Sequence, residues 1–510
     1  MLNIQEPIEK RVFKNILLGI LSFIITFLNA VISVPILLHF WGKETYGLWL
    51  SLFAGFSLLQ TLDLGHQNYI GNKLNLLYHT DKDEFKKVLG SSLIIAYFIG
   101  ALQILFGLYI FYAGLVGDFL GAEILKSEVV HVEIALMALL IMWFIFGSVS
   151  GIIIRILIPA GMMYQTQWLG ILLRFSQFIA LLLVAVLGGK ILSAGIIIAI
   201  VQAGVTIFFL VYVKRKLPEF FPWWEVRNWK TSFNNFKYSL TLTVIIIVTQ
   251  LGNNGIVLFI AKFFQSAVVP LYTTLRTITN TAMSATNIFM NAILPDIVKF
   301  HAKGEKEKLL ISLDTHWFMS GAVVNIGIIL MIPFVEKIYM FWTGGQLVFN
   351  LTLFLCLASG ISFYNFGSGL ITYLSGINDL TSQVIITSSR VLIIFITGYF
   401  LINKAGLTAI GIGILISEII SSVILSLFFV KLRLRKMNTK INLKSVITAL
   451  IPPSIILLDI LLLTLMNYDT VIVSIASLIF LLIIYSVNWF NLDVEVKERV
   501  KLMIKNFKFA

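Results

Sequence analysis

The chain has 510 residues, of which 58% are hydrophobic and only 12% are charged. A soluble domain carries about 25% charged residues, so this composition excludes an array of soluble domains with water-exposed surfaces. The net charge of +13 does not indicate a nucleic-acid-binding protein, because the basic residues stand in short loops between apolar runs, which is the pattern of membrane topology.

Apolar runs long enough to cross a bilayer, for which about 20 residues are needed, follow one another along the chain. The first, from about 14 to 40, follows Lys10, Arg11 and Lys14. It is too long for the apolar core of a signal peptide, so we expect an uncleaved first helix. Thirteen further runs lie at about 47–70, 88–113, 130–157, 168–188, 193–213, 238–263, 268–294, 311–334, 349–373, 383–402, 407–430, 446–466 and 470–490. The sequence therefore predicts an all-α integral membrane protein with about fourteen transmembrane helices.

The basic residues orient these runs. If the N-terminus is cytoplasmic and the runs alternate, 28 of the 38 lysines and arginines fall on the cytoplasmic side and six on the other, while four arginines stay inside runs. A miscounted helix would exchange the sides of all later loops and weaken this bias. We therefore expect an even number of spans, with both termini in the cytoplasm.

A weak internal repeat predicts the domain organisation. A shift of 223 residues places Lys14 on Lys237 and Phe40 on Phe263. Six helices separate the copies, which fits a parallel repeat about an axis along the membrane normal. We expect an N-lobe at 1–213, a cytoplasmic linker at 214–237, a C-lobe at 238–430, and two further helices with a basic cytoplasmic tail at 431–510. The tryptophan-rich linker lies either at the membrane interface or simply between the lobes, and the basic tail is expected to rest on anionic lipid.

Four runs carry polar residues at helical spacing, so that each set shares one helix face. Two interpretations stay open: hydrogen bonds between packed helices, or a hydrophilic cavity shared by the first helix pair of each lobe. The sets are Ser22, Thr26, Asn29 and Ser33; Gln60, Asp63 and Gln67; Ser239, Thr243, Gln250, Asn253 and Asn254; and Arg276, Asn280, Ser284, Asn287 and Asn291.

Charged residues inside the runs sharpen the cavity interpretation, because a charge at mid-membrane must be paired or face water. Arg390 and Glu418, on adjacent runs, form either a structural ion pair or substrate contacts. Arg174 and Arg276 have no obvious partner, and arginine binds phosphate in a bidentate manner, so a phosphorylated substrate is indicated. Asp63 is either a proton site or a helix-end carboxylate close to Lys73 (the latter favoured).

Motifs of built-in chemistry are missing. The sequence contains no GxxxxGK[ST], HExxH or GxSxG motif, so we expect no ATPase, no catalytic residues and no enzyme activity. The single cysteine, Cys356, excludes an intramolecular disulfide, and the six histidines include no pair at metal-ligand spacing on one helix face. We expect neither a metal nor a cofactor.

Three short segments resemble a known family. Tyr46–Trp49 (YGLW), Leu62–Gly65 (LDLG) and Gly71–Leu74 (GNKL) closely resemble the opening of O-antigen flippases of the Wzx type. These belong to the polysaccharide-biosynthesis branch of the MOP exporter superfamily, which also holds the MATE drug antiporters and the lipid II flippase. The helix count, the cytoplasmic termini and the lobe pattern extend the resemblance over the whole chain, although Val269–Tyr272 replaces the first motif in the second lobe.

The resemblance implies a flippase of the bacterial inner membrane. It would carry undecaprenyl-pyrophosphate-linked oligosaccharide repeat units to the periplasmic leaflet by alternating access, for O-antigen or other surface polysaccharide. Its partners would be membrane lipids, a polysaccharide polymerase and a chain-length regulator, with no nucleic acid. H⁺ or Na⁺ coupling or the membrane potential would supply the energy. The family does not assign residue roles here. From the polar faces we expect Arg276, then Arg174, to contact pyrophosphate, and the asparagines to contact sugar hydroxyls.

Two other functions remain possible from the sequence. A MATE-like antiporter would expel cationic drugs, but it should place several carboxylates in the cavity, where only Asp63 is found. A membrane polymerase or ligase acting on lipid-linked sugars would need a long periplasmic loop, and the loops here are short.

Overall fold

The computed structural model describes residues 8–121 and 126–507, apart from the side chains of residues 8–16, 126–127, 285–293, 295–296, 491, 499 and 502–507. These described residues form helices joined by turns and contain no β-strand. The helices fall into two compact units: unit 1 comprises Met1–Pro270 with Trp342–Leu347, and unit 2 comprises Leu271–Phe341 with Val348–Ala510. The expected first helix of the C-lobe, 238–263, thus lies in unit 1. The division into two six-helix lobes stays a prediction.

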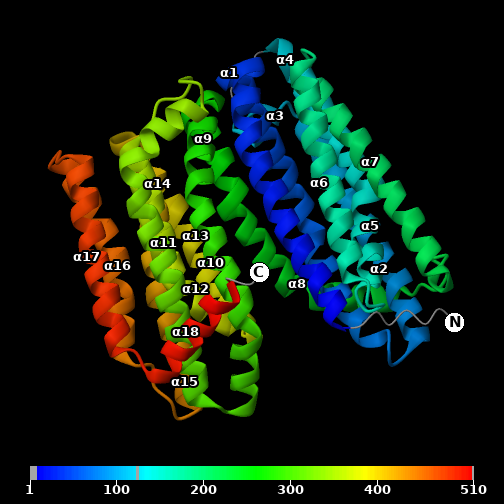
Figure 1. Cartoon of the computed structure of the whole chain (residues 1–510). Coiled ribbons are helices and arrows are strands. Elements are labelled where there is room, and N and C mark those ends of the chain that lie inside the picture. The colour runs from blue at the N-terminus through cyan, green and yellow to red at the C-terminus, as the bar shows by residue number, and fades with distance from the viewer. Residues whose placement is uncertain (1–7, 122–125, 508–510) are drawn as a thin grey trace. The chain divides into compact units, whose positions relative to one another are not determined.

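Unit 1 is built from long helices that pack side by side, among them α1, α6 and α7 (Figure 1). Its elements are α1 (Ile8–Leu77), α2 (Lys82–Tyr112), α3 (Val116–Leu120), α4 (Lys126–Met142), η1 (Trp143–Gly147), α5 (Ser148–Ile153), η2 (Ile154–Leu157), α6 (Met163–Val186), α7 (Ile191–Lys216), η3 (Pro218–Phe220), α8 (Trp229–Gln250), η4 (Leu251–Gly255), α9 (Ile256–Phe264) and η5 (Ser266–Val268).

Helix α1 covers the first two predicted spans. The chain changes direction at Gly42, whose φ of 70° and ψ of 174° are accessible to glycine at little cost and are strained for other residues. The short loop expected between 40 and 47 is therefore a kink between two helical halves. Further along, Gly65 allows α1 to approach α8 closely, because a Cβ atom there would lie 2.3 Å from the Cα of Thr243.

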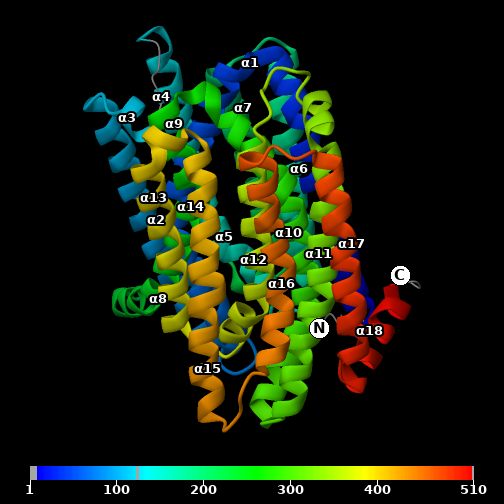
Figure 2. The same ribbon diagram turned by 90° about the vertical axis from the view of Figure 1, so that its left-hand side faces the viewer.

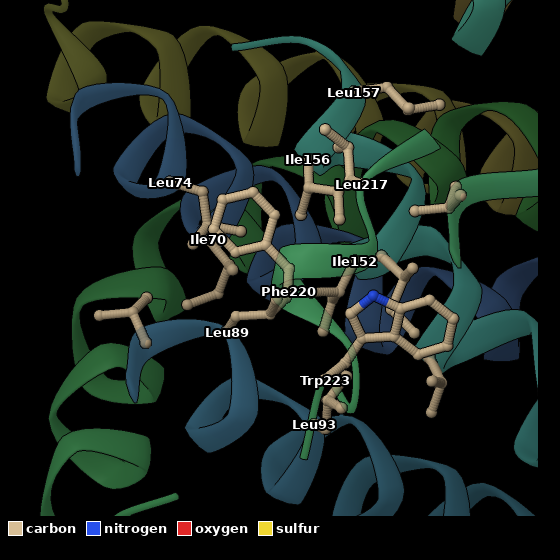
Figure 3. Close-up of a cluster of buried hydrophobic side chains, with 14 of the residues drawn as sticks. Ile70, Leu74, Leu89, Leu93, Ile152, Ile156, Leu157, Leu217, Phe220 and Trp223 are labelled. Carbon is tan, nitrogen blue, oxygen red and sulfur yellow. The ribbon is translucent and has the colours of Figure 1, made fainter. Parts of the chain in front are cut away.

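A hydrophobic cluster closes the end of unit 1 that contains the linker (Figure 3). Ile70 and Leu74 of α1 pack with Leu89 of α2, and Phe220 and Trp223 of the linker are buried among them. Burial of such side chains contributes roughly 2 kcal/mol each. The linker is therefore docked on unit 1 through Trp223.

The next tryptophans of the linker region behave differently. Trp224 is 49% exposed and Trp229 is 65% exposed, and Trp229 stacks on Phe233 of α8. The two interpretations of this segment are thus divided along the chain: Trp223 is packed inside the protein, while the exposed rings that follow have the amphipathic character of membrane-interface residues.

Unit 2 is built around α12, which is buried along almost its whole length. Its elements are α10 (Val269–Lys303), α11 (Lys306–Trp342), α12 (Leu351–Gly376), α13 (Leu380–Ala405), α14 (Thr408–Glu418), η6 (Ile419–Leu425), α15 (Ser426–Lys436), α16 (Leu443–Ile460), η7 (Leu461–Leu465), α17 (Thr470–Asn491) and α18 (Val494–Phe507). A Cβ atom at Gly367 would lie 2.0 Å from the carbonyl oxygen of Ser422, so glycine is required where α12 touches η6.

The turn between α12 and α13 is held by a charged hydrogen bond. Asp379 accepts from Nε of Arg433 at 2.6 Å and from Oγ of Ser382 at 2.7 Å, and its side chain is only 4% exposed. Burial opposes the charge of Asp379, but these hydrogen bonds outweigh it and lower the pKa of the carboxyl below its usual value. The turn is therefore stabilised only while Asp379 is ionised.

The C-terminal helix α18 lies against unit 2. Val496 and Val500, four residues apart on one helix face, are each 1% exposed, while Glu495 and Lys501 are exposed. This is the amphipathic pattern expected of the basic tail. Its contact with anionic lipid stays a prediction.

Twelve of the described helices are long and apolar enough to cross a membrane. One of them, α1, carries two predicted spans, and α10 coincides with the predicted span at 268–294. Every predicted run therefore falls on a helix, so the chain is a multi-pass membrane protein. The predicted all-α membrane fold with about fourteen spans is confirmed.

Candidate functional site

The polar face of the first half of α1 meets an arginine of α6. Nη2 of Arg174 donates to Oγ of Ser22 at 2.8 Å, and its Nε donates to the carbonyl oxygen of Gly170 at 3.3 Å. Both acceptors are neutral, and the ion pairs of the described residues do not include Arg174. The side chain is exposed on unit 1, so its charge is available to an anionic ligand.

The other polar residues of this half of α1 are bonded within the helix. Oγ1 of Thr26 donates to the carbonyl oxygen of Ser22 at 2.8 Å, and Oγ of Ser33 donates to Oδ1 of Asn29 at 2.8 Å. Thr26 is exposed and Asn29 is half-buried. Asn29 thus keeps its amide nitrogen on the same helix face as Ser22, near Arg174.

The second half of α1 carries a buried carboxylate. Asp63 is 1% exposed and accepts hydrogen bonds from Oγ of Ser148 and, at 3.0 Å, from Nε2 of Gln67. Lys73 instead donates to Oδ1 of Asn235 on α8 at 2.9 Å. The favoured interpretation, a helix-end carboxylate close to Lys73, is therefore wrong: Asp63 is buried between α1 and α5, and Lys73 joins α1 to α8.

Arg155, near the end of the fourth predicted span, belongs to the same region. Its Nη2 donates to Oδ1 of Asn68 at 2.6 Å, and its Nε donates to the carbonyl oxygen of Gly151 at 3.2 Å. These bonds tie η2 to α1. The buried part of unit 1 therefore contains one carboxylate and one guanidinium, each held by neutral groups.

The predicted polar face of 238–263 is divided between packing and exposure. Ser239 and Thr243 are buried, with Oγ of Ser239 3.4 Å from Nδ1 of His66 on α1. Farther along the chain, Nδ2 of Asn254 donates to Oε1 of Gln250 at 2.9 Å. Asn253 is exposed. The first half of this face thus joins helices, as the packing interpretation expects, and the η4 half is open.

Helix α10 of unit 2 carries the remaining predicted contacts. The guanidinium of half-buried Arg276 lies 5.8 Å from the centre of the Tyr272 ring. Asn280 is exposed, and its carbonyl oxygen accepts from Oγ of Ser284 at 3.0 Å. The side chains of Asn287 and Asn291 lie outside the described residues. The arginine and the described polar groups share one face of α10.

The structure thus brings the predicted residues together in three groups within unit 1, namely Arg174 with Ser22, Asp63 with Gln67, and Gln250 with Asn254. Arg276 and Asn280 form a group of their own on unit 2. A single chamber lined by all four polar faces stays a prediction.

Arg390 and Glu418 form the ion pair that was one of their two interpretations. Nε of Arg390 lies 2.9 Å from Oε1 of Glu418. Oγ of Ser422 accepts from Nη2 of Arg390 at 2.7 Å and donates to Oε2 of Glu418. The guanidinium also lies 5.4 Å from the centre of the Tyr364 ring. The pair connects α13 with α14 and η6, and a role in substrate contact stays open.

Sequence reasoning missed a polar core in unit 2. Nε2 of His316 on α11 lies 2.9 Å from Oγ of Ser368 and 3.2 Å from the carbonyl oxygen of Asn365. Asn325 donates to the hydroxyl of Tyr485 on α17 at 3.2 Å. The signal was present on α12, where Ser362, Asn365 and Ser368 recur every three residues within an apolar run.

Four π-helical segments were also missed, and each adjoins membrane-embedded polar groups. They are η1, which precedes Ser148; η4, which contains Asn253 and Asn254; η6, which follows Glu418; and η7, which follows buried Asp459. A π-turn inserts one residue into a helix and redirects the side chains around it, which is why such turns cluster at functional sites. Hydropathy periodicity does not detect a single inserted residue.

The part of the chain that the structure describes contains no cluster of three or more His, Cys, Asp or Glu side chains that could hold a metal ion. Its polar groups are arginines, amides and hydroxyls in neutral hydrogen bonds. Such a set can bind phosphate and sugar hydroxyls.

The fold places the chain among membrane proteins built like transporters of the MOP superfamily. It is similar to a multidrug resistance MATE family transporter of the MOP superfamily in the inward-facing conformation, with a TM-score of 0.64 and 16% identity over 82% of this chain and 95% of that one. It is also similar to the lipid II flippase MurJ in an inward closed conformation, with a TM-score of 0.66 and 12% identity over 93% of this chain and 99% of that one.

No protein-family model matches the chain, and no curated protein sequence matches it. The resemblance to MOP proteins is thus confirmed at the level of the fold. At 12–16% identity, neither neighbour identifies the substrate.

Proposed function

We propose that this chain is a flippase that moves undecaprenyl-pyrophosphate-linked oligosaccharide repeat units from the cytoplasmic to the periplasmic leaflet of a bacterial inner membrane. The observation that carries the proposal is the extent of the likeness to the lipid II flippase MurJ, which covers 93% of this chain and 99% of the flippase. The MATE transporter is itself covered to 95% but accounts for only 82% of this chain. The motifs of residues 46–74 support the same branch of the superfamily.

The chemistry of the polar groups suits this substrate. Arg174 has only neutral oxygens as its hydrogen-bond acceptors, and Arg276 lies half-buried on α10. Two guanidinium groups can bind a pyrophosphate through bidentate hydrogen bonds. The amides of Asn29, Asn254 and Asn280 would bind sugar hydroxyls, while the polyprenyl tail stays in the bilayer.

The transport cycle follows from the two-lobe prediction. Movement of one lobe against the other would expose the substrate site to each leaflet in turn, with H⁺, Na⁺ or the membrane potential as the energy source. The chain is then a transporter and not an enzyme. It would hand its substrate to a polysaccharide polymerase and a chain-length regulator for surface-polysaccharide synthesis.

A cation-coupled MATE-like drug antiporter is the second candidate. The likeness to a multidrug resistance transporter and the buried carboxylate Asp63 favour it. It is the weaker candidate because the likeness leaves more of this chain uncovered, and because a cationic drug would be repelled by Arg174 and Arg276.

The proposal is tested in a bacterium whose own O-antigen flippase gene is deleted. The chain should restore surface glycan, Arg174→Lys should retain most of this activity, and Arg174→Ala should reduce it about tenfold or more, because one charged hydrogen-bond donor is lost from the phosphate. Arg227→Ala, at an exposed linker arginine, is the matched control. Membrane insertion is followed by blotting.

Normal surface glycan in Arg174→Ala would contradict the assigned role of this arginine. Drug resistance conferred by the chain without any restored glycan would overturn the flippase proposal and favour the antiporter.

A further inference from the structure

A groove of about 860 Å³ lies between the end of α15 and the start of α16. In Figure 2 the turn that joins these helices lies at the bottom of the view. The groove is lined by the basic side chains of Lys431, Arg435 and Lys440 and by apolar residues of α16 and the turn, and no acidic residue lines it. The lining is therefore strongly cationic at one end of a membrane-spanning unit.

The walls of the groove are fixed by the fold. At the end of α15, Asn438 adopts a left-handed conformation with φ of 53°, and the amide of Thr439 donates to the carbonyl oxygen of Leu434 at 3.0 Å, as in a helix-terminating Schellman motif. Leu434 and Val446 are buried in the hydrophobic core of unit 2. The turn is thus anchored from both helices, and its three cations are held on a prebuilt surface.

Exposed apolar side chains continue from the basic end along both helices. On α15, Phe428 precedes Lys431 by three residues and is 54% exposed. On α16, Leu443 and Ile447 share one helix face and are 64% and 53% exposed. The groove therefore has a cationic head region and two apolar stripes that run into the membrane-spanning part. This pattern fits an amphiphile with an anionic head.

We propose that this groove binds an anionic glycerophospholipid. The lipid phosphate contacts Lys431, Arg435 and Lys440, and an acyl chain lies along Phe428 and Leu443. The charge bias of the loops assigns this turn to the cytoplasmic side, where anionic lipids attract basic segments. A soluble phosphate would use the cations but would leave the apolar stripes without a ligand, so a lipid is the better fit. The proposal is independent of the transported substrate.

Native mass spectrometry of the purified, delipidated protein tests the proposal. The protein is titrated with phosphatidylglycerol and, separately, with phosphatidylcholine of the same acyl chains. The wild type should retain one phosphatidylglycerol at least about tenfold more tightly than phosphatidylcholine. The triple variant Lys431→Gln, Arg435→Gln, Lys440→Gln should lose this preference.

A matched triple variant in the same unit, Lys299→Gln, Lys303→Gln, Lys306→Gln, removes three exposed basic residues elsewhere and should keep the preference. Thermal unfolding of both variants shows that each is folded. A second variant of the groove, Leu443→Ser, should weaken phosphatidylglycerol binding while leaving all three cations in place.

Three results would overturn the proposal. Equal binding of the two lipids would show that the cations do not select an anionic head. Equal loss in both triple variants would show unspecific attraction by net charge. Displacement of the lipid by millimolar inorganic pyrophosphate, with no effect of Leu443→Ser, would show that the groove binds a soluble anion.

Discussion

Breaking the ion pair between Arg390 and Glu418 should destabilise the protein more than removing both charges together. The side chains are 20% and 11% exposed, and Nε lies 2.9 Å from Oε1. Removing one partner of a buried pair costs about 3–5 kcal/mol, because the remaining charge stays buried without compensation. Ser422 bonds to both side chains and would compensate part of that loss, so we expect about 2–3 kcal/mol for either single variant.

The variants are Arg390→Met, Glu418→Gln and the double variant, which keep the side-chain volumes nearly constant. The double variant should be less destabilised than the sum of the singles, with a coupling energy of about 2 kcal/mol. Unfolding by denaturant in mild detergent, followed by tryptophan fluorescence, measures the free energies. Additive costs would refute the pair as a stabilising contact. Loss of transport in a stable double variant would instead assign these residues to the substrate.

Two further predictions concern the packing of each unit. The lowered pKa of Asp379 means that its ion pair with Arg433 contributes stability above pH 4 and loses it as the pH falls through the folded-state pKa. The stability deficit of Asp379→Asn, about 1 kcal/mol at pH 7 because Arg433 is partly exposed, should therefore shrink below pH 4; a deficit that persists there would contradict the charge assignment. In unit 1, Gly65→Ala should cost about 1–3 kcal/mol, because the new methyl group collides with the backbone of Thr243. Gly204→Ala, where no atom lies within 4 Å of the new Cβ, should be neutral or stabilising, and equal unfolding free energies for the two variants would refute the close approach.

Much of the fold could be predicted because hydropathy and basic loops depend on residue type alone. Every predicted run falls on a helix. The joining of the first two runs in α1 could not be predicted, since Trp41–Lys43 reads as a loop and only the backbone of Gly42 shows a kink. Equally, nothing in the apolar run 130–157 indicates the π-turn η1 that precedes Ser148.

The candidate site was predicted less completely, because a polar residue on a helix face does not show what it touches. Asp63 and Gln67 have cavity-like spacing, yet both are buried and bonded to each other. Arg174 was identified from its charge, but its contact with Ser22 joins residues 152 positions apart. Such contacts depend on tertiary packing, which periodicity within one helix does not report.

Lipid translocation in reconstituted vesicles tests the central claim most directly. The purified protein is placed in proteoliposomes with a fluorescent undecaprenyl-pyrophosphate-linked oligosaccharide, and the fraction reduced by external dithionite is followed over time. The account predicts that the label becomes accessible in both leaflets at a rate well above that of protein-free vesicles, and that Arg174→Ala slows this rate. Equal rates with and without protein, together with drug efflux from the same vesicles, would contradict it.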